Sequence, residues 1–132
     1  MKLSSFIGAG AMLIAAFCCP AHAITATEQL TAYTAQAGAP AQAARGQTLF
    51  TSKHGKEWSC SSCHTVTPTV EGKHATTGKA IAPMAPAFNP ERFSDAAKAE
   101  KWFRRNCNDV MGRECTAGEK ADVLAWLLTL KR

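Results

Sequence analysis

Five consecutive residues, Cys60-Ser61-Ser62-Cys63-His64, have the types and the spacing that can bind an iron porphyrin. Each cysteine thiol can add to one vinyl group of haem, and the two thioethers then fix the porphyrin to the backbone. The histidine that directly follows the second cysteine presents an imidazole nitrogen to the iron. The pattern therefore predicts one covalent haem c, bound through Cys60 and Cys63, with His64 as an iron ligand.

Two other interpretations of this cysteine pair are less favoured. A redox-active disulfide between Cys60 and Cys63 is typical of a strand–helix–strand surrounding, which the flanking sequence does not indicate. A zinc site would need Cys107 and Cys115 as further ligands, but these lie eight positions apart, wider than the spacing of a zinc knuckle. Haem attachment remains the interpretation that the motif fits best.

The N-terminal stretch has the layout of a secretory signal peptide. Met1-Lys2 gives a positive start, residues 6–17 are apolar, and Ala21-His22-Ala23 provides small residues before a cut at Ile24. The apolar run is too short for a membrane span, which needs about 20 residues. We expect a cleaved signal peptide, residues 1–23, and a periplasmic cytochrome c domain without a membrane span, residues 24–132.

Six cysteines are divided between the leader and the remaining chain. Cys18 and Cys19 leave with the leader, and the bulky Phe17 argues against a lipid anchor on either. Free thiols do not persist in an oxidising compartment, so the two cysteines that haem does not use are expected to pair. A Cys107–Cys115 disulfide would close a nine-residue loop and stabilise the fold by about 2–3 kcal/mol.

The charge balance says little about partners. Removal of Lys2 with the leader lowers the formal net charge from +5 to +4. Such a modest positive charge could favour binding to an acidic partner surface, and it is explained equally well by a role in keeping the protein soluble. No dense Lys/Arg block with interleaved aromatic residues predicts nucleic-acid binding.

Capping signals predict an all-α fold with a few helices and long loops. Thr27 can cap a first helix that Gly38 ends, and Pro40 suits the first position of a second helix that reaches Thr51. Ser94 opens a third helix, which runs to about Gly112. Thr116 and Glu119 form a capping box before the largely apolar last helix.

A long stretch, residues 66–90, contains four prolines and two glycines and shows no apolar period. Such a segment is unusual inside a small domain unless it wraps a bound group. We expect it to wrap the haem.

The ligand on the other side of the iron is ambiguous. Met84 lies in a proline-flanked loop that could deliver a thioether, a ligand that suits a closed electron carrier, but it could also simply pack against the porphyrin. Met111 is a further possibility near a helix end. His54 and His74 could give bis-histidine ligation, although their polar surroundings favour a surface position.

Asn106 is the remaining candidate. Helical spacing places it on one side of the third helix with apolar residues, and a buried amide without a partner costs about 1–3 kcal/mol. An amide oxygen is a weak, hard ligand that suits ferric iron and is easily lost on reduction. A hydrogen bond to a haem carboxylate or to the backbone would also satisfy it. The apolar neighbours on that side are Ala99, Trp102, Phe103 and Val110.

The C-terminal half resembles the sphaeroides haem protein family, well beyond the haem motif. The similarity covers nearly the whole predicted mature chain and also includes Gly38-Ala39-Pro40 and Arg45-Gly46. Its most specific segments are Asn89-Pro90-Glu91-Arg92-Phe93-Ser94-Asp95, Arg105-Asn106-Cys107-Asn108 and Gly112-Arg113-Glu114-Cys115-Thr116.

This resemblance implies a class I-like cytochrome c fold with an extra N-terminal helix. It also implies that Asn106 binds ferric iron and leaves on reduction, so that the open ferrous iron can take oxygen, nitric oxide or carbon monoxide. The Cys107–Cys115 disulfide is implied as well. The related cytochrome c double-prime carries histidine at the position of Asn106, so the asparagine places this chain with the first group.

One position departs from the family, which usually has leucine where this chain has Met84. The alternative function is therefore a conventional electron carrier with His64 and Met84 as ligands. The family is associated with a dihaem cytochrome c and a membrane cytochrome b as donors. Lys101, Arg104 and Arg105 could help to dock such a partner, or could be a solvated helix face. No acid–base or nucleophile constellation stands out, so no catalytic residue is assigned.

Overall fold

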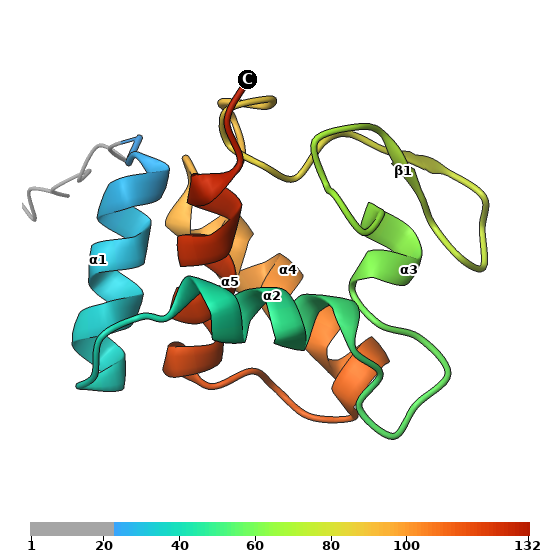
Figure 1. Ribbon diagram of the computed structural model, residues 1–132, viewed down its shortest axis with the longest axis horizontal. Helices are drawn as coiled ribbons and strands as arrows, with labels where there is room; N and C mark the ends of the chain where they lie inside the picture. Colours follow the sequence, from blue (N-terminus) through green and yellow to red (C-terminus); the bar gives the residue numbers. More distant parts are fainter. Residues whose placement is uncertain (1–22) are drawn as a thin grey trace, which may run out of the picture.

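The computed structural model describes residues 23–132, and nearly all of the predicted signal peptide lies outside the described residues. Helices are the main regular structure of the described chain, as predicted, and the one sheet is short and two-stranded (Figure 1). The elements are α1 (Ala26–Ala37), α2 (Ala43–Thr51), α3 (Ser61–His64), β1 (Gly72–Lys73), β2 (Ala80–Ile81), α4 (Ala96–Met111) and α5 (Ala117–Thr129).

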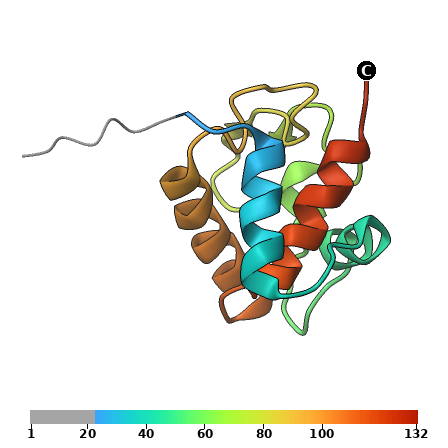
Figure 2. The same cartoon turned by 90° about the vertical axis from the view of Figure 1, so that its left-hand side faces the viewer.

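Helix α5 forms the centre of the molecule, and α1 and α2 both pack against it (Figure 2). Six of its residues are buried, which fits the largely apolar sequence that predicted this helix. Tyr33 of α1 meets Phe103 of α4 edge-on, with ring centroids 5.8 Å apart, and Phe50 of α2 lies 5.0 Å from Trp126 of α5. The first contact joins α1 to α4 and the second joins α2 to α5, and all four rings belong to one buried core.

Helices α2 and α5 cross at Gly46. A Cβ atom there would overlap the backbone carbonyl of Asp122, so only glycine allows this approach. The Asp122 side chain is buried and accepts hydrogen bonds from the Gln42 backbone N–H at 2.7 Å and from the Arg45 guanidinium. The carboxylate therefore caps the start of α2 and is neutralised by the same helix.

The last helix begins where its sequence predicted. Thr116 accepts a hydrogen bond from the Glu119 backbone N–H, and the Glu119 carboxylate accepts one from the Thr116 backbone N–H at 2.8 Å. Arg113 adds an ion pair to Glu119 at 2.7 Å. This arginine and the backbone bonds lower the pKa of Glu119 to about 2, so the capping box keeps its charge at neutral pH.

Three predicted helix starts were wrong by one to three residues. Helix α1 is capped by Thr25 and not by Thr27, because Thr25 forms the capping box with Glu28. Asp95, rather than Ser94, caps α4. Helix α2 begins at Ala43 after an extended Gln42, and not at Pro40, because the backbone N–H of Gln42 binds Asp122 of α5, a partner that local sequence does not contain.

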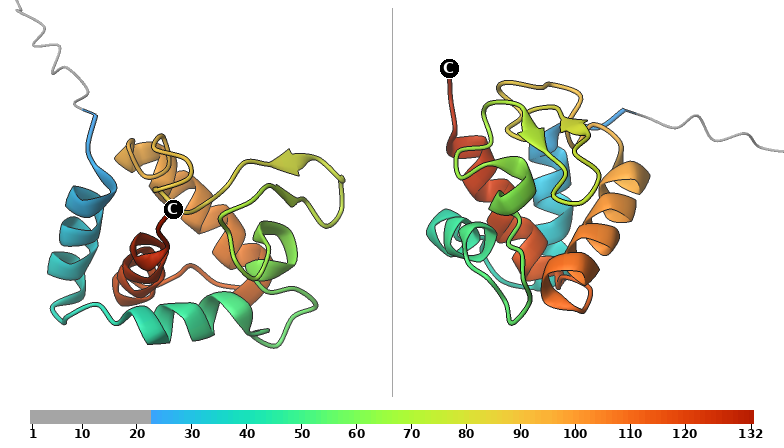
Figure 3. Two further views of the ribbon diagram at one scale, coloured as in Figure 1. Left: turned by 45° about the horizontal axis from the view of Figure 1, so that its top comes forward. Right: turned by 90° about the vertical axis from the view of Figure 1, so that its right-hand side faces the viewer.

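The predicted structureless stretch contains a small hairpin. Strands β1 and β2 pair antiparallel, with Gly72 opposite Ile81 and Lys73 opposite Ala80. Further along, the Pro68 carbonyl accepts hydrogen bonds from the backbone N–H groups of Met84 and Ala85, each at 3.0 Å. The segment therefore folds back on itself beside α3 and away from α1 (Figure 3). Within the described part of the chain, no helix has the length and apolar character of a membrane span.

We expect Gly46→Ala to destabilise the protein, because the new methyl group overlaps backbone that cannot move without separating α2 from α5. Overpacking of this kind costs about 1–3 kcal/mol. Gly118→Ala is the matched control, since its Cβ would lie 3.8 Å from the nearest side chain, an ordinary contact. Chemical denaturation should show a clear loss in the free energy of unfolding for Gly46→Ala and none for Gly118→Ala. Equal free energies of unfolding for the two variants would contradict the close crossing of α2 and α5.

Candidate haem site

The predicted haem-binding residues lie on a single helical turn. Helix α3 begins after Cys60, whose carbonyl accepts from the His64 backbone N–H at 3.1 Å, and it ends at Thr65, where φ is 67°. In this turn Cys60, Cys63 and His64 have the i, i+3, i+4 spacing that places side chains on one face. Ser59, buried before the turn, fixes its entry through hydroxyl contacts of 2.8 and 3.1 Å to Ser61 and Ser62.

The hairpin supports this turn from behind. A Cβ atom on Gly72 of β1 would overlap the carbonyl oxygen of Cys63, so the strand reaches α3 only because residue 72 is glycine. The Ala75 backbone N–H also lies 3.3 Å from the Cys63 sulfur. The segment that the sequence marked as a wrapping loop therefore holds the attachment turn in place.

A cleft opens beside α3, between the hairpin segment and α4. It has two lobes of about 320 and 530 Å³, within the range of ligand pockets in proteins. The Cys lobe contains Cys60 and Cys63, and the Arg lobe contains Arg92. Eight residues line both lobes, which makes them two ends of one cavity: His64, His74, Thr77, Ile81, Met84, Phe103, Asn106 and Asp109.

His64 has the surroundings of a metal ligand. Burial, together with the positive charge of Arg92 and with His74, lowers its pKa to about 4, so the imidazole is neutral at physiological pH. Its Nδ1 atom is buried and has no hydrogen-bond partner among the described residues. A neutral imidazole with an unsatisfied buried nitrogen fits an iron ligand, and with the two thiols of α3 it fits a covalent haem.

Two of the candidates for the sixth iron ligand reach the cleft from different elements. Met84 comes from the loop after β2, and Asn106 comes from α4; both are half-buried and line both lobes. The Met84 loop is held by the Pro68 carbonyl on one side, and on the other side Arg92 donates to the carbonyls of Ala82 and Pro83 at 2.8 and 3.1 Å. Both residues remain candidates on this geometry.

The other candidates are engaged differently. The sulfur of Met111 lies 3.6 Å from the sulfur of Cys115. The Nε2 atom of His54 lies within hydrogen-bonding distance, 2.7 Å, of the Leu49 carbonyl oxygen. Neither Met111 nor His54 lines either lobe of the cleft. His74 is exposed, as expected, yet it borders the cleft. Its Nδ1 atom accepts from the backbone N–H groups of Thr76 and Thr77, at 3.3 and 3.2 Å.

The face of α4 is rotated relative to the predicted apolar stripe. Trp102 is 43% exposed, whereas Cys107 is 3% exposed and takes a place in the core. The buried row is Ala99, Phe103, Cys107 and Val110. Asn106 lies beside this row at the wall of the cleft, where an amide can meet a bound group instead of apolar side chains.

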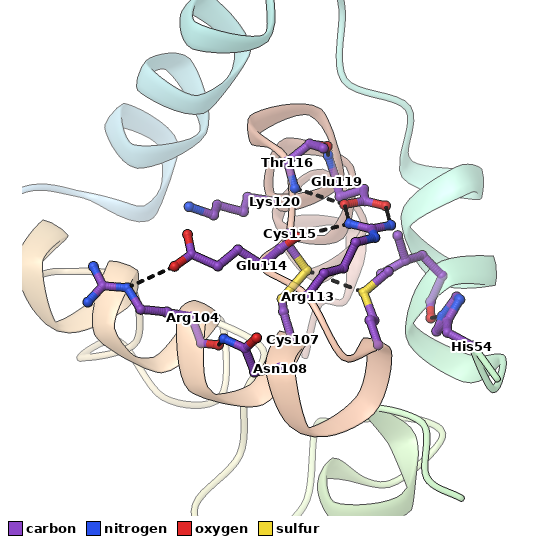
Figure 4. The surroundings of a disulfide bond; sticks show 12 residues. His54, Arg104, Cys107, Asn108, Arg113, Glu114, Cys115, Thr116, Glu119 and Lys120 are labelled. Atoms are coloured by element: carbon purple, nitrogen blue, oxygen red, sulfur yellow. Dashed lines mark hydrogen bonds and ion pairs between the residues drawn. A yellow bond between two sulfur atoms is a disulfide. The ribbon is translucent and has the colours of Figure 1, made fainter. Parts of the chain in front are cut away.

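The predicted disulfide is present. Cys107, near the end of α4, is bonded to Cys115, in the segment before α5 (Figure 4). These sulfur atoms are therefore not available for the zinc site that was the alternative, and no disulfide joins Cys60 to Cys63. Burial raises the pKa of Cys60 to about 11, so its thiol is protonated until it reacts.

Arg92 is a feature of the cleft that sequence reasoning did not single out as functional. Its guanidinium is half-buried and reaches the Arg lobe, while its backbone bonds fix the Met84 loop. In the sequence it is one of fifteen basic residues, and although it lies in the family-like segment of residues 89–95, that resemblance assigned it no role.

Comparison with known proteins decides the family. A cytochrome c-type protein, SHP, from Cereibacter sphaeroides is 55% identical over 108 residues, which cover 78% of this chain and 83% of the relative. The chain belongs to the sphaeroides haem protein family. A family model described as a domain of unknown function (DUF1924) matches residues 36–127. Cytochrome c'' of Methylophilus methylotrophus is 48% identical over 80 residues, covering 61% of this chain and 56% of that protein.

Solved structures agree on the fold. The structure of oxidised SHP, an oxygen-binding cytochrome c, has a TM-score of 0.75 at 48% identity and covers 80% of this chain and 97% of that one. Oxidised cytochrome c'' from Methylophilus methylotrophus gives 0.73 at 38% identity, with 81% and 95% covered. The SHP family likeness confirms the predicted class I-like cytochrome fold, and c-type relatives imply a covalent haem, with which the Cys60 and Cys63 motif is consistent.

Removal of the disulfide should weaken the fold around Asn106 without removing haem. We expect Cys107→Ser with Cys115→Ser to lower the free energy of unfolding by about 2–3 kcal/mol, because the unfolded chain regains the entropy of an eight-residue separation. Denaturant titration of the haem-loaded protein measures this. A stability equal to that of the wild type would mean that the bond does not constrain α4.

Proposed function

We propose that this chain is a periplasmic monohaem cytochrome that accepts an electron and, once reduced, binds a diatomic gas. The observation that carries the proposal is that His64 and Asn106 line the same cleft from separate elements, in a chain 55% identical to a cytochrome c-type protein. A solved SHP structure is described as an oxygen-binding cytochrome c, which supports gas binding here.

When bound, haem supplies one-electron chemistry and an iron whose free position takes oxygen, nitric oxide or carbon monoxide. Cys60 and Cys63 tether it, and His64 provides the permanent ligand. The apolar walls, which include Phe50 and Phe103, exclude water from the site. Exclusion of water strengthens every electrostatic contact that the chain makes there.

Asn106 acts as the replaceable ligand in this proposal. Its amide oxygen would be a ligand for ferric iron and a poor one for the softer ferrous iron, so that it would be the ligand given up on reduction. The neighbouring Cys107 is tied to Cys115, so we expect the amide to leave by side-chain rotation while the helix backbone stays in place. The freed NH₂ group can then donate a hydrogen bond to a gas molecule in the cleft.

A second candidate function follows from Met84, which lines the same cleft as Asn106. A thioether ligand would close the iron in both oxidation states and make the protein a conventional electron carrier. The two functions differ in which side chain binds the ferric iron.

Two substitutions separate these functions. We expect Asn106→Ala to change the ferric absorbance spectrum of the haem-loaded protein, because it removes the sixth ligand. Met84→Leu, the matched control on the other side chain, should leave that spectrum unchanged. The reverse pattern, with the spectrum altered by Met84→Leu alone, would contradict ligation by Asn106 and support the electron carrier.

The periplasmic location is part of the proposal and rests on the signal-peptide pattern of residues 1–23. A c-type cytochrome with a disulfide also suits an oxidising compartment. The mass of the exported protein should equal that of a chain that begins at Ile24 plus one covalently attached haem.

We further propose that an acidic dihaem cytochrome c, itself supplied by a membrane cytochrome b, donates the electron at the outer face of α4. Lys101 and Arg105 are exposed there, and the Arg105 guanidinium lies 5.2 Å from the ring centre of Trp102, which borders the cleft. Arg104 is engaged with Glu114 at 3.4 Å, so Lys101 and Arg105 carry the available charge.

Charge reversal tests this surface. We expect Lys101→Glu with Arg105→Glu to slow reduction by a purified acidic dihaem cytochrome c at low salt by about tenfold or more, since steering raises association rates by 10–10³. The control is Lys131→Glu, at the exposed C-terminus. An equal rate for all three proteins would exclude α4 as the docking face.

A further inference from the structure

The two lobes of the cleft differ in chemistry along one direction. The thiols of Cys60 and Cys63 lie at one end, the candidate iron ligands His64, Met84 and Asn106 line both lobes, and Arg92 lies at the other end. This order matches the order of groups across a haem. Its vinyl edge and its two carboxylates are on opposite sides of the iron.

The Arg92 guanidinium is a half-buried charge that has no acidic partner among the described residues. It donates two hydrogen bonds, both to uncharged backbone carbonyls, and no carboxylate forms an ion pair with it among the described residues. A guanidinium carries five N–H groups, so three are left to donate. A half-buried cation in this state is costly unless an anion pairs with it.

We propose that Arg92 binds a carboxylate of the haem and thereby fixes the orientation of the porphyrin and raises its reduction potential. The inference rests on the proposed covalent haem. The planar fork of a guanidinium matches a carboxylate in a bidentate pair. Because its positive charge offsets the carboxylate's negative charge beside the iron, Arg92 favours the ferrous state.

Other cations of the same lobe do not have this arrangement. Lys79, Lys98 and Arg105 line it but are exposed, and Arg105 is stacked on Trp102. Exposed charges are screened by solvent and salt. The acidic residues of the lobe, Glu91, Asp95 and Asp109, are exposed as well, and Asp95 is used as the cap of α4.

The test must separate binding of the haem carboxylate by Arg92 from the hydrogen bonds by which Arg92 fixes the Met84 loop. We would therefore place Arg92→Gln in a Met84→Leu background, where a displaced loop cannot bring a thioether to the iron. Arg105→Gln in the same background is the matched control, with the same loss of charge at the same lobe. The measurements are the reduction potential and the resonance Raman band of the haem carboxylates, made on the full haem-loaded protein.

We expect Arg92→Gln to shift the equilibrium towards the ferric form about tenfold, which is a fall of about 59 mV for one electron, and to move the carboxylate band. Arg105→Gln should change the equilibrium less than threefold and leave the band in place. Equal, small effects of the two variants would overturn the inference.

If Arg92→Gln yields no haem-loaded protein, Arg92→Lys provides the answer. Lysine keeps the charge but lacks the fork, so the carboxylate band should still move while the potential changes little. An unmoved band in Arg92→Lys would overturn the inference. Absence of covalent haem from the wild-type protein, seen in its mass, would instead contradict the proposed function itself.

Discussion

The close crossing of α2 over α5 at Gly46 is the constraint on which the rest of the fold depends. Because residue 46 has no side chain, the two helices approach until the Asp122 carboxylate caps α2 and binds Arg45. That crossing places Phe50 against Trp126 and, with Leu49, at the wall of the cleft. The cavity is thus formed by helix packing on one side and by the hairpin segment on the other.

Sequence reasoning worked where the signal was local. The capping box at Thr116 and Glu119 lies within four residues, and the motif that ends at His64 is contiguous, so both could be placed from sequence. The disulfide followed from counting the cysteines left after haem attachment. The start of α2 was missed because its cap comes from a residue eighty positions away.

The wall of the cleft was harder to predict for a different reason. Helical spacing correctly grouped Asn106 with one side of α4, but it could not set the rotation of that helix to within one residue. Cys107 and not Trp102 occupies the core, and Cys107 is bonded there to Cys115 in the segment before α5. Arg92 lies in a family-like segment but could not be assigned a role from sequence, since its surroundings depend on two carbonyls that folding brings beside it.

In the proposed function reduction opens the haem iron, and the absorbance spectrum of the reduced wild-type protein, recorded with and without carbon monoxide, shows whether it does. We expect a high-spin ferrous spectrum that changes at once when carbon monoxide is added, because the proposed Asn106 ligand would have left the iron. Sharp low-spin ferrous bands that ignore carbon monoxide, with a sulfur-to-iron band in the ferric state, would contradict it and identify Met84 as the ligand.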